Sequence, residues 1–320
     1  MNLSFSGMES VQIRAGRFQF TILPDDSLFL PIYKGSTFRG GFGHAFRRVL
    51  CTIKKETCAE CLLRERCIYS YIFETPPPPG TTIMRKYTTA PHPFIIEPPE
   101  EDSRMYGPGE ELSFGLVLIG KAVDYLPYFI YTFDELGRIG LGRGKGRFTL
   151  KSVTAGGKII YTAEAKTIGA FDEDLIPLSN LSPEFADKDV ESATLTFKTP
   201  CRIKYNMSLA PEIEFHILIR QLIRRMSLLY YFHCGGDSSG WNFRGIIKEA
   251  GEVNVAKHDL NWYDWERYSS RQGEKMKMGG LVGSITFKGP LSHFMPLLRA
   301  GEILHVGKGT SFGLGKYELR

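Results

Sequence analysis

The amino-acid sequence predicts an α+β protein made of two ferredoxin-like βαββαβ domains in tandem. Three observations predict this fold class. The length of 320 residues suits two domains. Residues 112–150 match residues 281–319 without gaps, and each half of the chain starts with an expected strand and a longer helix. Hydrophobic residues make up 42% of the chain and charged residues 23%. The chain can therefore bury a core, and global disorder is excluded.

The first half begins with an alternating pattern and continues with a helical one. Residues 11–23 are expected to form a strand and residues 36–50 a helix. Apolar side chains recur along this helix at spacings that place them on one face. They are Phe38, Phe42, Ala45, Phe46 and Val49. A second strand, from residue 112, leads to a short apolar helix, a glycine-rich loop and a final strand.

The second half has the same order of elements. Residues 193–205 are expected to form a strand and residues 212–233 a helix. The core stripe of this helix consists of Phe215, Leu218, Ile219, Leu222, Met226 and Leu229. A strand from residue 281 again leads to a short helix, a glycine-rich loop and a final strand.

The gapless match between the two halves contains seven identical pairs. They are Leu112/Leu281, Gly120/Gly289, Pro127/Pro296, Gly140/Gly309, Gly144/Gly313, Gly146/Gly315 and Leu150/Leu319. Composition alone would give about two or three identities in such a window. The excess indicates a duplicated module.

Proline and polar residues mark the expected boundaries. Nine of the 18 prolines lie between Pro76 and Pro108, where no helix and no central strand can form. The first domain is therefore expected at residues 1–155, with a cysteine- and proline-rich insertion at about residues 51–110. Residues 156–190 are expected to form a linker, and residues 191–320 the second domain.

The charges are distributed unevenly along the chain. The formal net charge of +5 is small, so the placement of charge matters more than its sum. Residues 27–55 and 136–163 contain no acidic residue, whereas acids gather in residues 97–111 and 172–191. Two interpretations stay open. Either the solvent-exposed faces happen to carry charges of different sign, or the basic stretches form a positive surface that binds a polyanion.

Four of the six cysteines lie close together in the sequence. No apolar run is long enough to span a bilayer and no secretory signal is visible, so we expect a cytoplasmic protein with reduced cysteines. The inner two, Cys58 and Cys61, form a Cys-x2-Cys pair, and Cys51 and Cys67 lie on either side of it. Such a set is typical of a four-thiolate zinc site. We expect a structural zinc ion and no catalytic metal. The alternative is a group of free thiols.

Residues 30–48 combine a helix start with glycines and basic side chains. Ser36 or Thr37 can cap the helix. Lys34 and Arg39 lie near the free N–H groups of this helix start, which makes it a candidate phosphate site. Three glycines in its first turns remove side chains, so that a ligand's backbone could approach closely.

His44 lies on this helix but outside its apolar stripe. It is about 200° around the helix from the core residue Phe42, and it falls on the side of Gly40, Gly41 and Arg48. A histidine satisfied inside the core is therefore disfavoured. A functional histidine and a plain surface histidine both stay open.

Two glycine-rich loops, residues 140–147 and 307–315, contain lysine and arginine. Neither is a P-loop, and neither is a dinucleotide fingerprint, because each leads into a strand. Flexible glycines with basic residues suit the cradling of a phosphate backbone. The alternative is a pair of tight turns between packed elements. His305, just before the second loop, is a secondary candidate for RNA contact or acid–base work.

The second glycine-rich loop also carries a family resemblance. Residues 305–317, His-Val-Gly-Lys-Gly-Thr-Ser-Phe-Gly-Leu-Gly-Lys-Tyr, are similar to the terminal glycine-rich motif of the CRISPR-associated RAMP (repeat-associated mysterious protein) superfamily. Residues 267–272, 279–283 and 35–40 also look like segments of this superfamily. Within it, the chain resembles the endoribonucleases that process precursor CRISPR RNA. The resemblance covers most of the chain outside the proline-rich insertion.

This resemblance implies RRM-like domains that bind CRISPR repeat RNA and cut it without a metal to give mature guide RNAs. The ribose 2′-OH would attack the adjacent phosphate and leave a 2′,3′-cyclic phosphate and a 5′-OH. That reaction needs a general base, a general acid and positive charge. His44 fits the position of the family's histidine, and Tyr33 fits an assisting phenol. Lys34, Arg47 or Arg48 could stabilise the charge, and we expect Arg48 to be catalytic.

The resemblance also implies the surface that contacts RNA. The expected RNA-binding residues are Lys34, Arg39, Arg47, Arg143, Lys145, Arg147, His305, Lys308, Thr310, Ser311 and Lys316. Subunits of a CRISPR effector complex are further candidate partners, and no membrane is expected. Two other functions stay open: a non-catalytic RAMP subunit that grips guide RNA, and a zinc-stabilised interaction protein.

Overall fold

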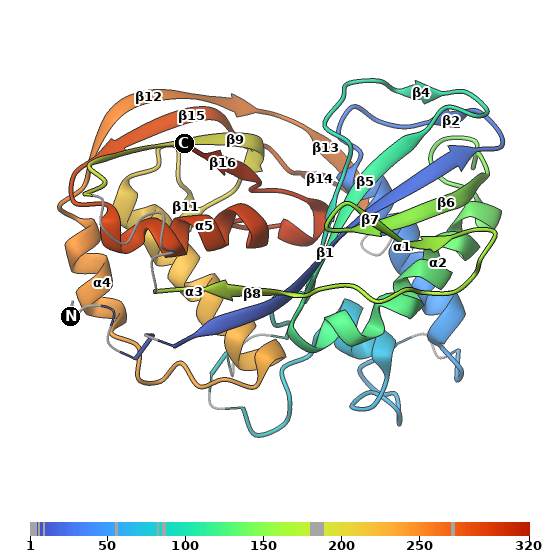
Figure 1. The fold of residues 1–320 in the computed structure, drawn as a ribbon, viewed down its shortest axis with the longest axis horizontal. Coiled ribbons are helices and arrows are strands. Elements are labelled where there is room, and N and C mark those ends of the chain that lie inside the picture. Colours follow the sequence, from blue (N-terminus) through green and yellow to red (C-terminus); the bar gives the residue numbers. More distant parts are fainter. Residues whose placement is uncertain are drawn as a thin grey trace. The chain divides into compact units, whose positions relative to one another are not determined.

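The chain folds into two compact units (Figure 1). The computed structural model describes residues 5, 7–8, 10–54, 57–81, 83–84, 88–179, 189–269 and 273–320. The N-terminal unit contains Arg14–Asp174 and Phe232–Cys234. The C-terminal unit contains Met1–Ile13, Leu175–Tyr231 and Gly235–Arg320.

The first half of the chain alternates strands with two main helices. Its strands are β1 (Gln12–Pro24), β2 (Leu28–Phe29), β3 (Phe94–Glu97), β4 (Met105–Tyr106), β5 (Leu112–Ile119), β6 (Phe148–Ala155) and β7 (Lys158–Thr162). Its helices are α1 (Gly35–Leu50) and α2 (Leu126–Ile139), with a π-helical turn at Ser70–Glu74 and a 3-10 turn at Gly120–Tyr125. Strand β8 (Asp174–Pro177) follows.

The second half repeats this plan with added pieces. Its strands are β9 (Ser192–Cys201), β10 (Lys204–Tyr205), β11 (Ser208–Leu209), β12 (Asn254–Tyr263), β13 (Glu266–Ser269), β14 (Glu274–Lys277), β15 (Gly280–Lys288) and β16 (Tyr317–Leu319). Its helices are α3 (Phe215–Cys234), α4 (Phe243–Ala250) and α5 (Met295–Leu304), with 3-10 turns at Ser292–Phe294 and Thr310–Phe312.

The two main sheets have the same strand order. The first runs β3-β5-β1-β6 and continues to β7, and the second runs β12-β15-β9-β16. Each pair of neighbours in these two orders is antiparallel. In each copy, the first strand of the βαββαβ motif lies between the third and the fourth, as a ferredoxin-like module requires. The predicted fold class, with two tandem copies, is confirmed.

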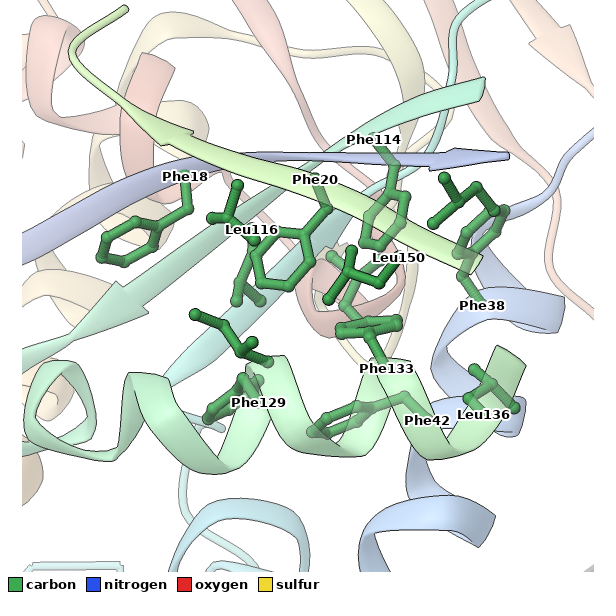
Figure 2. Packing of buried hydrophobic residues seen from close by; sticks show 14 of the residues in the cluster. Phe18, Phe20, Phe38, Phe42, Phe114, Leu116, Phe129, Phe133, Leu136 and Leu150 are labelled. Atoms are coloured by element: carbon green, nitrogen blue, oxygen red, sulfur yellow. The ribbon is translucent and has the colours of Figure 1, made fainter. Parts of the chain in front are cut away.

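The core of the N-terminal unit is aromatic. Figure 2 shows phenylalanines of the strands, among them Phe20 and Phe114, pointing towards Phe42, Phe129 and Phe133 of the helices. Phe42 of α1 stacks on Phe129 of α2 with ring centroids 4.9 Å apart. All five side chains are buried. Burial of this apolar surface holds α1 and α2 against the sheet.

The C-terminal unit has an apolar inner face and a hydroxyl-lined outer face. Phe215 of α3 packs edge-on against Phe287 of β15, with centroids 5.0 Å apart. On the other side of the sheet, the hydroxyls of Thr194 and Thr286 are 2.8 Å apart. The alternation along β9 and β15 therefore places apolar residues under the helix and half-buried hydroxyls on the other side of the sheet.

Two expected irregular segments contain strands. Residues 94–97, which fall within the expected insertion, form β3 at the edge of the sheet, flanked by Pro93 and Pro98. Edge strands tolerate neighbouring prolines because one side needs no ladder bonds. Residues 158–162, within the expected linker, form β7, which pairs with β6. Residues 180–188 of that linker lie outside the described residues.

Candidate active site and RNA interface

Helix α1 positions the candidate histidine. The helix begins at Gly35 and buries Phe38, Phe42 and Phe46 among other residues. The expected cap by Ser36 or Thr37 does not form, because the N-cap residue is Lys34 and its side chain makes no capping bond. The core stripe, and not a capping side chain, holds this helix in place.

His44 is exposed, as its place off the apolar stripe predicts. Gly40, one turn before it, and Arg48, one turn after it, are also exposed. Residues four apart on a helix are surface neighbours, with Cβ atoms about 5–6 Å apart. The outer side of α1 therefore presents an imidazole next to a guanidinium, with an open backbone beside them.

Three of the four glycines of α1, Gly40, Gly41 and Gly43, have different roles. A Cβ on Gly43 would lie 2.0 Å from Cζ of Phe73, and one on Gly41 would lie 2.8 Å from Cδ1 of Leu141. Packing inside the protein therefore requires these two glycines, in contrast to the expected role in ligand approach. Gly40 alone of the three has nothing within 4 Å of a built Cβ. Only there can a ligand's backbone come close to the helix.

Lys34 is buried and does not reach the surface, although the sequence predicts a phosphate ligand. Its side chain is 1% exposed, and its Nζ donates to the carbonyl oxygens of Glu101 at 2.6 Å and Ile32 at 3.3 Å. Burial lowers the pKa of the ammonium, and the charge of Glu101 opposes this effect. Lys34 ties the start of α1 to the segment before β4.

Two arginines of α1 and the tyrosine before it are partly enclosed. Arg39 contacts His92 at 3.2 Å and lies 4.1 Å above the ring of Phe73. The pKa of the Cys58 thiol is raised mainly by burial, and the charge of Arg47 opposes that rise. Arg47 therefore lies near the cysteine segment. Tyr33 is half-buried. Among these candidates, Arg48 remains the exposed guanidinium next to His44.

The first glycine-rich loop lies against α1 and presents two free cations. Leu141 of the loop contacts Gly41. Arg143 and Lys145 are exposed and make no ion pair with another described residue. Arg147 is exposed as well, but its Nε binds Asp26 at 2.9 Å. The loop therefore packs on α1 through its buried Leu141 and presents Arg143 and Lys145 to solvent.

The second glycine-rich loop presents less than the sequence predicts. Thr310, Ser311 and His305 are buried, with His305 fully enclosed and its Nδ1 3.2 Å from the carbonyl oxygen of Leu314. They serve the packing of the loop and are not surface RNA ligands in this structure. Lys308 is exposed and Lys316 is half-buried.

Backbone and hydroxyl bonds hold this second loop against the end of β9. The amide of Lys308 donates to the carbonyl oxygen of Arg202 at 2.8 Å. Thr199 donates its hydroxyl to the carbonyl oxygen of Gly313 at 2.7 Å. Gly315 adopts a φ of 73°, and a Cβ there would lie 1.8 Å from the carbonyl oxygen of Val306. Glycine is required because of this close approach.

Two arginines add positive charge beside the second loop. Arg202 donates to the carbonyl oxygen of Gly279 at 2.8 Å. Arg267 lies 4.7 Å above the ring of Phe312, and its buried Nε has no partner among the described residues. Burial lowers the pKa of both guanidinium groups. The candidate list from the sequence omits both residues. The family-like segment at residues 267–272 was the available signal for Arg267, and residues 270–272 lie outside the described part.

The four clustered cysteines do not form a metal centre as placed. The charges of Cys67 and Cys51 act on Cys58, so these thiols lie near one another. However, no three histidine, cysteine, aspartate or glutamate side chains within the described part are arranged to hold a metal ion. The four thiols are free in this structure. Zinc therefore stays a prediction from the spacing of the cysteines, and no step of the chemistry is assigned to it.

The described residues contain no helix of the length and apolarity needed to cross a bilayer.

Comparisons with known proteins identify the family. Residues 13–173, half of the chain, match the family model described as AF_1859_N, N-terminal domain. Residues 195–317 match the model of the CRISPR-associated endoribonuclease Cas6. The N-terminal half of the chain belongs to the AF_1859_N family, and its C-terminal domain matches the Cas6 family of CRISPR-associated endoribonucleases. The resemblance that the second glycine-rich loop indicates is confirmed.

Known relatives match this chain over nearly its whole length. An uncharacterized protein of Archaeoglobus fulgidus is 26% identical over 299 residues, 91% of this chain and 93% of that protein. Thermus thermophilus Cas6 has a TM-score of 0.53 at 14% identity, covering 96% of this chain and 99% of its own. The same Cas6 in a product complex has a TM-score of 0.57 at 14% identity, with the same coverage of both chains. At these identities, the structural likeness shows the shared fold.

Proposed function

We propose that this chain is an endoribonuclease that cuts CRISPR repeat RNA within the precursor transcript. The Cas6 family model supports the substrate class and the reaction. The observation that carries the proposal is the exposed His44, next to Arg48 on the outer side of α1. A histidine kept for packing would be buried on the core stripe. On this fold, an exposed imidazole beside a cation has the elements that RNA cleavage needs.

The proposed reaction uses the RNA's own ribose and no metal ion. His44 takes the proton of a 2′-OH, and the 2′-oxygen then attacks the adjacent phosphorus. The bond from phosphorus to the 5′-oxygen breaks, and a general acid protonates the leaving oxygen. The products are a 2′,3′-cyclic phosphate and a 5′-OH. Tyr33 is the proposed proton donor.

Arg48 is the proposed group that stabilises the charge of the transition state. Positive charge near the pentacovalent phosphorus lowers the barrier because negative charge develops on its oxygens. Arg48 lies one helical turn from His44 and makes no ion pair within the described part of the chain. Lys34 is excluded from this role because its ammonium is buried against carbonyl oxygens.

The exposed cations of the two glycine-rich loops are the proposed contacts to the RNA backbone. Arg143 and Lys145 serve in the N-terminal unit, and Lys308 serves in the C-terminal unit. All three are exposed. Phosphate contacts position the RNA and supply most of the affinity, whereas contacts to bases supply the specificity. Effector subunits remain proposed protein partners.

The test is cleavage of labelled repeat RNA from the genome that encodes this chain, with EDTA present and with analysis of the product ends. We expect a cyclic phosphate end, and we expect His44→Ala to lower the rate by about 10²–10⁴ while RNA still binds. His258→Ala is the control, because His258 is an exposed histidine of β12. Loss of cleavage in EDTA would contradict the metal-independent mechanism. Binding without any cleavage would instead support the non-catalytic RAMP subunit.

A further inference from the structure

A small ladder outside the main sheets carries an aromatic residue that the proposed reaction does not use. Phe29 of β2 lies opposite Met105 of β4. On its other side, Phe29 forms an antiparallel bridge with Arg143, whose amide donates to the carbonyl oxygen of Phe29 at 2.9 Å. Residues directly opposite each other in antiparallel pairs share one face, about 4.5–5.5 Å apart. Met105, Phe29 and Arg143 therefore form a row of three side chains, which we call the Phe29 row.

The Phe29 row faces solvent. Phe29 is 46% exposed and Met105 is 59% exposed, and Arg143 is exposed as well. The neighbouring ladder residues Leu28 and Tyr106 point the other way and are buried in the core. One face of the ladder is thus anchored in the core, and the other face is exposed to solvent. Two adjacent apolar side chains on a fixed ladder offer a flat apolar surface to a ligand.

Exposed cations lie beside the row. Arg104 precedes Met105, and Lys145 follows Arg143 in the loop; both are exposed and make no ion pair with a described residue. Two acids of the segment before β4, Glu101 and Asp102, are exposed as well, and Glu101 accepts a hydrogen bond from Tyr106 at 2.8 Å. Arg104, Arg143 and Lys145 together can contact the phosphates of an anionic partner.

The glycines of the loop fix this arrangement and leave room beside it. Gly142 has a φ of 73°, and a Cβ there would lie 2.4 Å from the carbonyl oxygen of Phe29. Any other residue would push the loop off β2. Gly144 has a φ of 84° and nothing within 4 Å of a built Cβ. The loop is therefore held to the ladder on one side and open to a ligand on the other.

We propose that the Phe29 row binds an unpaired nucleotide of the RNA, which stacks its base on Phe29 and Met105 and places its phosphate against Arg143. This inference deepens the proposed function and rests on the chain binding RNA. Stacking on an aromatic ring suits any base, because each base has a π-face. The same loop packs on α1, the helix that carries His44, through Leu141 beside Gly41.

The experiment measures binding of a labelled single-stranded oligouridine and of repeat RNA by full-length chains. Phe29→Leu keeps an apolar side chain but removes the ring, whereas Phe29→Tyr keeps the ring. Tyr131→Ala is the matched control, because Tyr131 is 53% exposed on α2 of the same unit. We expect Phe29→Leu to weaken oligouridine binding about tenfold. Phe29→Tyr and Tyr131→Ala should leave it within about twofold of wild type.

A second readout separates the base contact from the phosphate contact. Arg143→Ala should reduce the slope of log affinity against log salt by about one, and Phe29→Leu should leave this slope unchanged. Equal binding by wild type and Phe29→Leu, with cleavage of repeat RNA intact, would overturn this inference and leave the proposed function standing. RNA binding that depends on Phe29, without any cleavage, would support nucleotide binding by the Phe29 row and contradict the proposed nuclease activity. No RNA binding by wild type would overturn both.

Discussion

The guanidinium of Arg225 in α3 donates a 2.7 Å hydrogen bond from its Nε to the carbonyl oxygen of Leu304, the last residue of α5. Arg225 is 8% exposed. Its Nη2 has no partner in the described part of the chain, and burial lowers its pKa. His305 follows Leu304 with a φ of 57° and opens the second glycine-rich loop. Arg225 therefore fixes the point from which this loop departs.

Arg225→Ala is expected to destabilise the C-terminal unit by about 3 kcal/mol, because it leaves a cavity and an unpaired carbonyl oxygen. Arg225→Met should cost only about 1 kcal/mol, since it restores the packing and removes a buried charge. Urea unfolding followed by tryptophan fluorescence measures both values. All three tryptophans, Trp241, Trp262 and Trp265, lie in this unit. Equal losses in the two variants would contradict this account.

Gly40→Ala and Gly43→Ala are expected to have opposite effects on the N-terminal unit. Gly40 has open space around it, so alanine should stabilise α1 by about 1 kcal/mol through its higher helix propensity. A Cβ on Gly43 would meet the ring of Phe73 at 2.0 Å, and overpacking should cost about 2 kcal/mol. Urea unfolding followed by circular dichroism measures both changes. Destabilisation by Gly40→Ala would show that α1 is packed differently.

Lys308→Ala and Lys34→Ala are expected to separate RNA binding from stability. Lys308 is exposed, so its loss should weaken RNA binding and lower the salt slope by about one. Lys34 is buried against two carbonyl oxygens, so its loss should destabilise the N-terminal unit by about 1–3 kcal/mol. Binding assays at several salt concentrations and urea unfolding give the two readouts. A salt slope that changes in Lys34→Ala but not in Lys308→Ala would contradict this assignment.

The contact between Asp26 and Arg147 is expected to add a small pH-dependent stabilisation. Hydrogen bonds from Arg147 lower the pKa of Asp26 below its value of 3.8 in the unfolded chain. The stabilisation is therefore present above pH 3.8 and is lost as the pH falls through the lower folded-state pKa. The difference in melting temperature between wild type and Asp26→Asn should shrink over this range. A difference in melting temperature that grows as the pH falls would contradict the expected direction of this effect.

Zinc in the cysteine segment stays a prediction from the spacing of the cysteines. Elemental analysis of the purified chain should find one zinc ion per chain if the four thiolates close around it. Cys58→Ser with Cys61→Ser should remove the metal and lower the melting temperature, whereas Cys201→Ser should leave the metal in place, because Cys201 is buried in the C-terminal unit. A metal-free wild-type chain would favour four free thiols, as in this structure.

Periodicity predicted the fold class, because both modules bury their cores through simple patterns. The 3.6-residue stripe of α1 and the internal match between residues 112–150 and 281–319 were readable from one sequence. The same stripe placed His44 on the open side of α1, where the structure also has it. Local patterns suffice there, because a helix face follows from spacing alone.

Tertiary structure decided which polar residues reach solvent. Lys34 and His305 have the sequence neighbourhoods of surface ligands, yet both are buried. Lys34 is covered by a segment distant in the chain, at Glu101, whereas His305 is enclosed by its own loop, at Leu314. The Phe29 row likewise exists only because β2, β4 and the first glycine-rich loop meet. Its members are far apart in sequence, and no spacing rule joins them. Composition and periodicity thus determined the modules, whereas long-range backbone pairing determined the surface that they present.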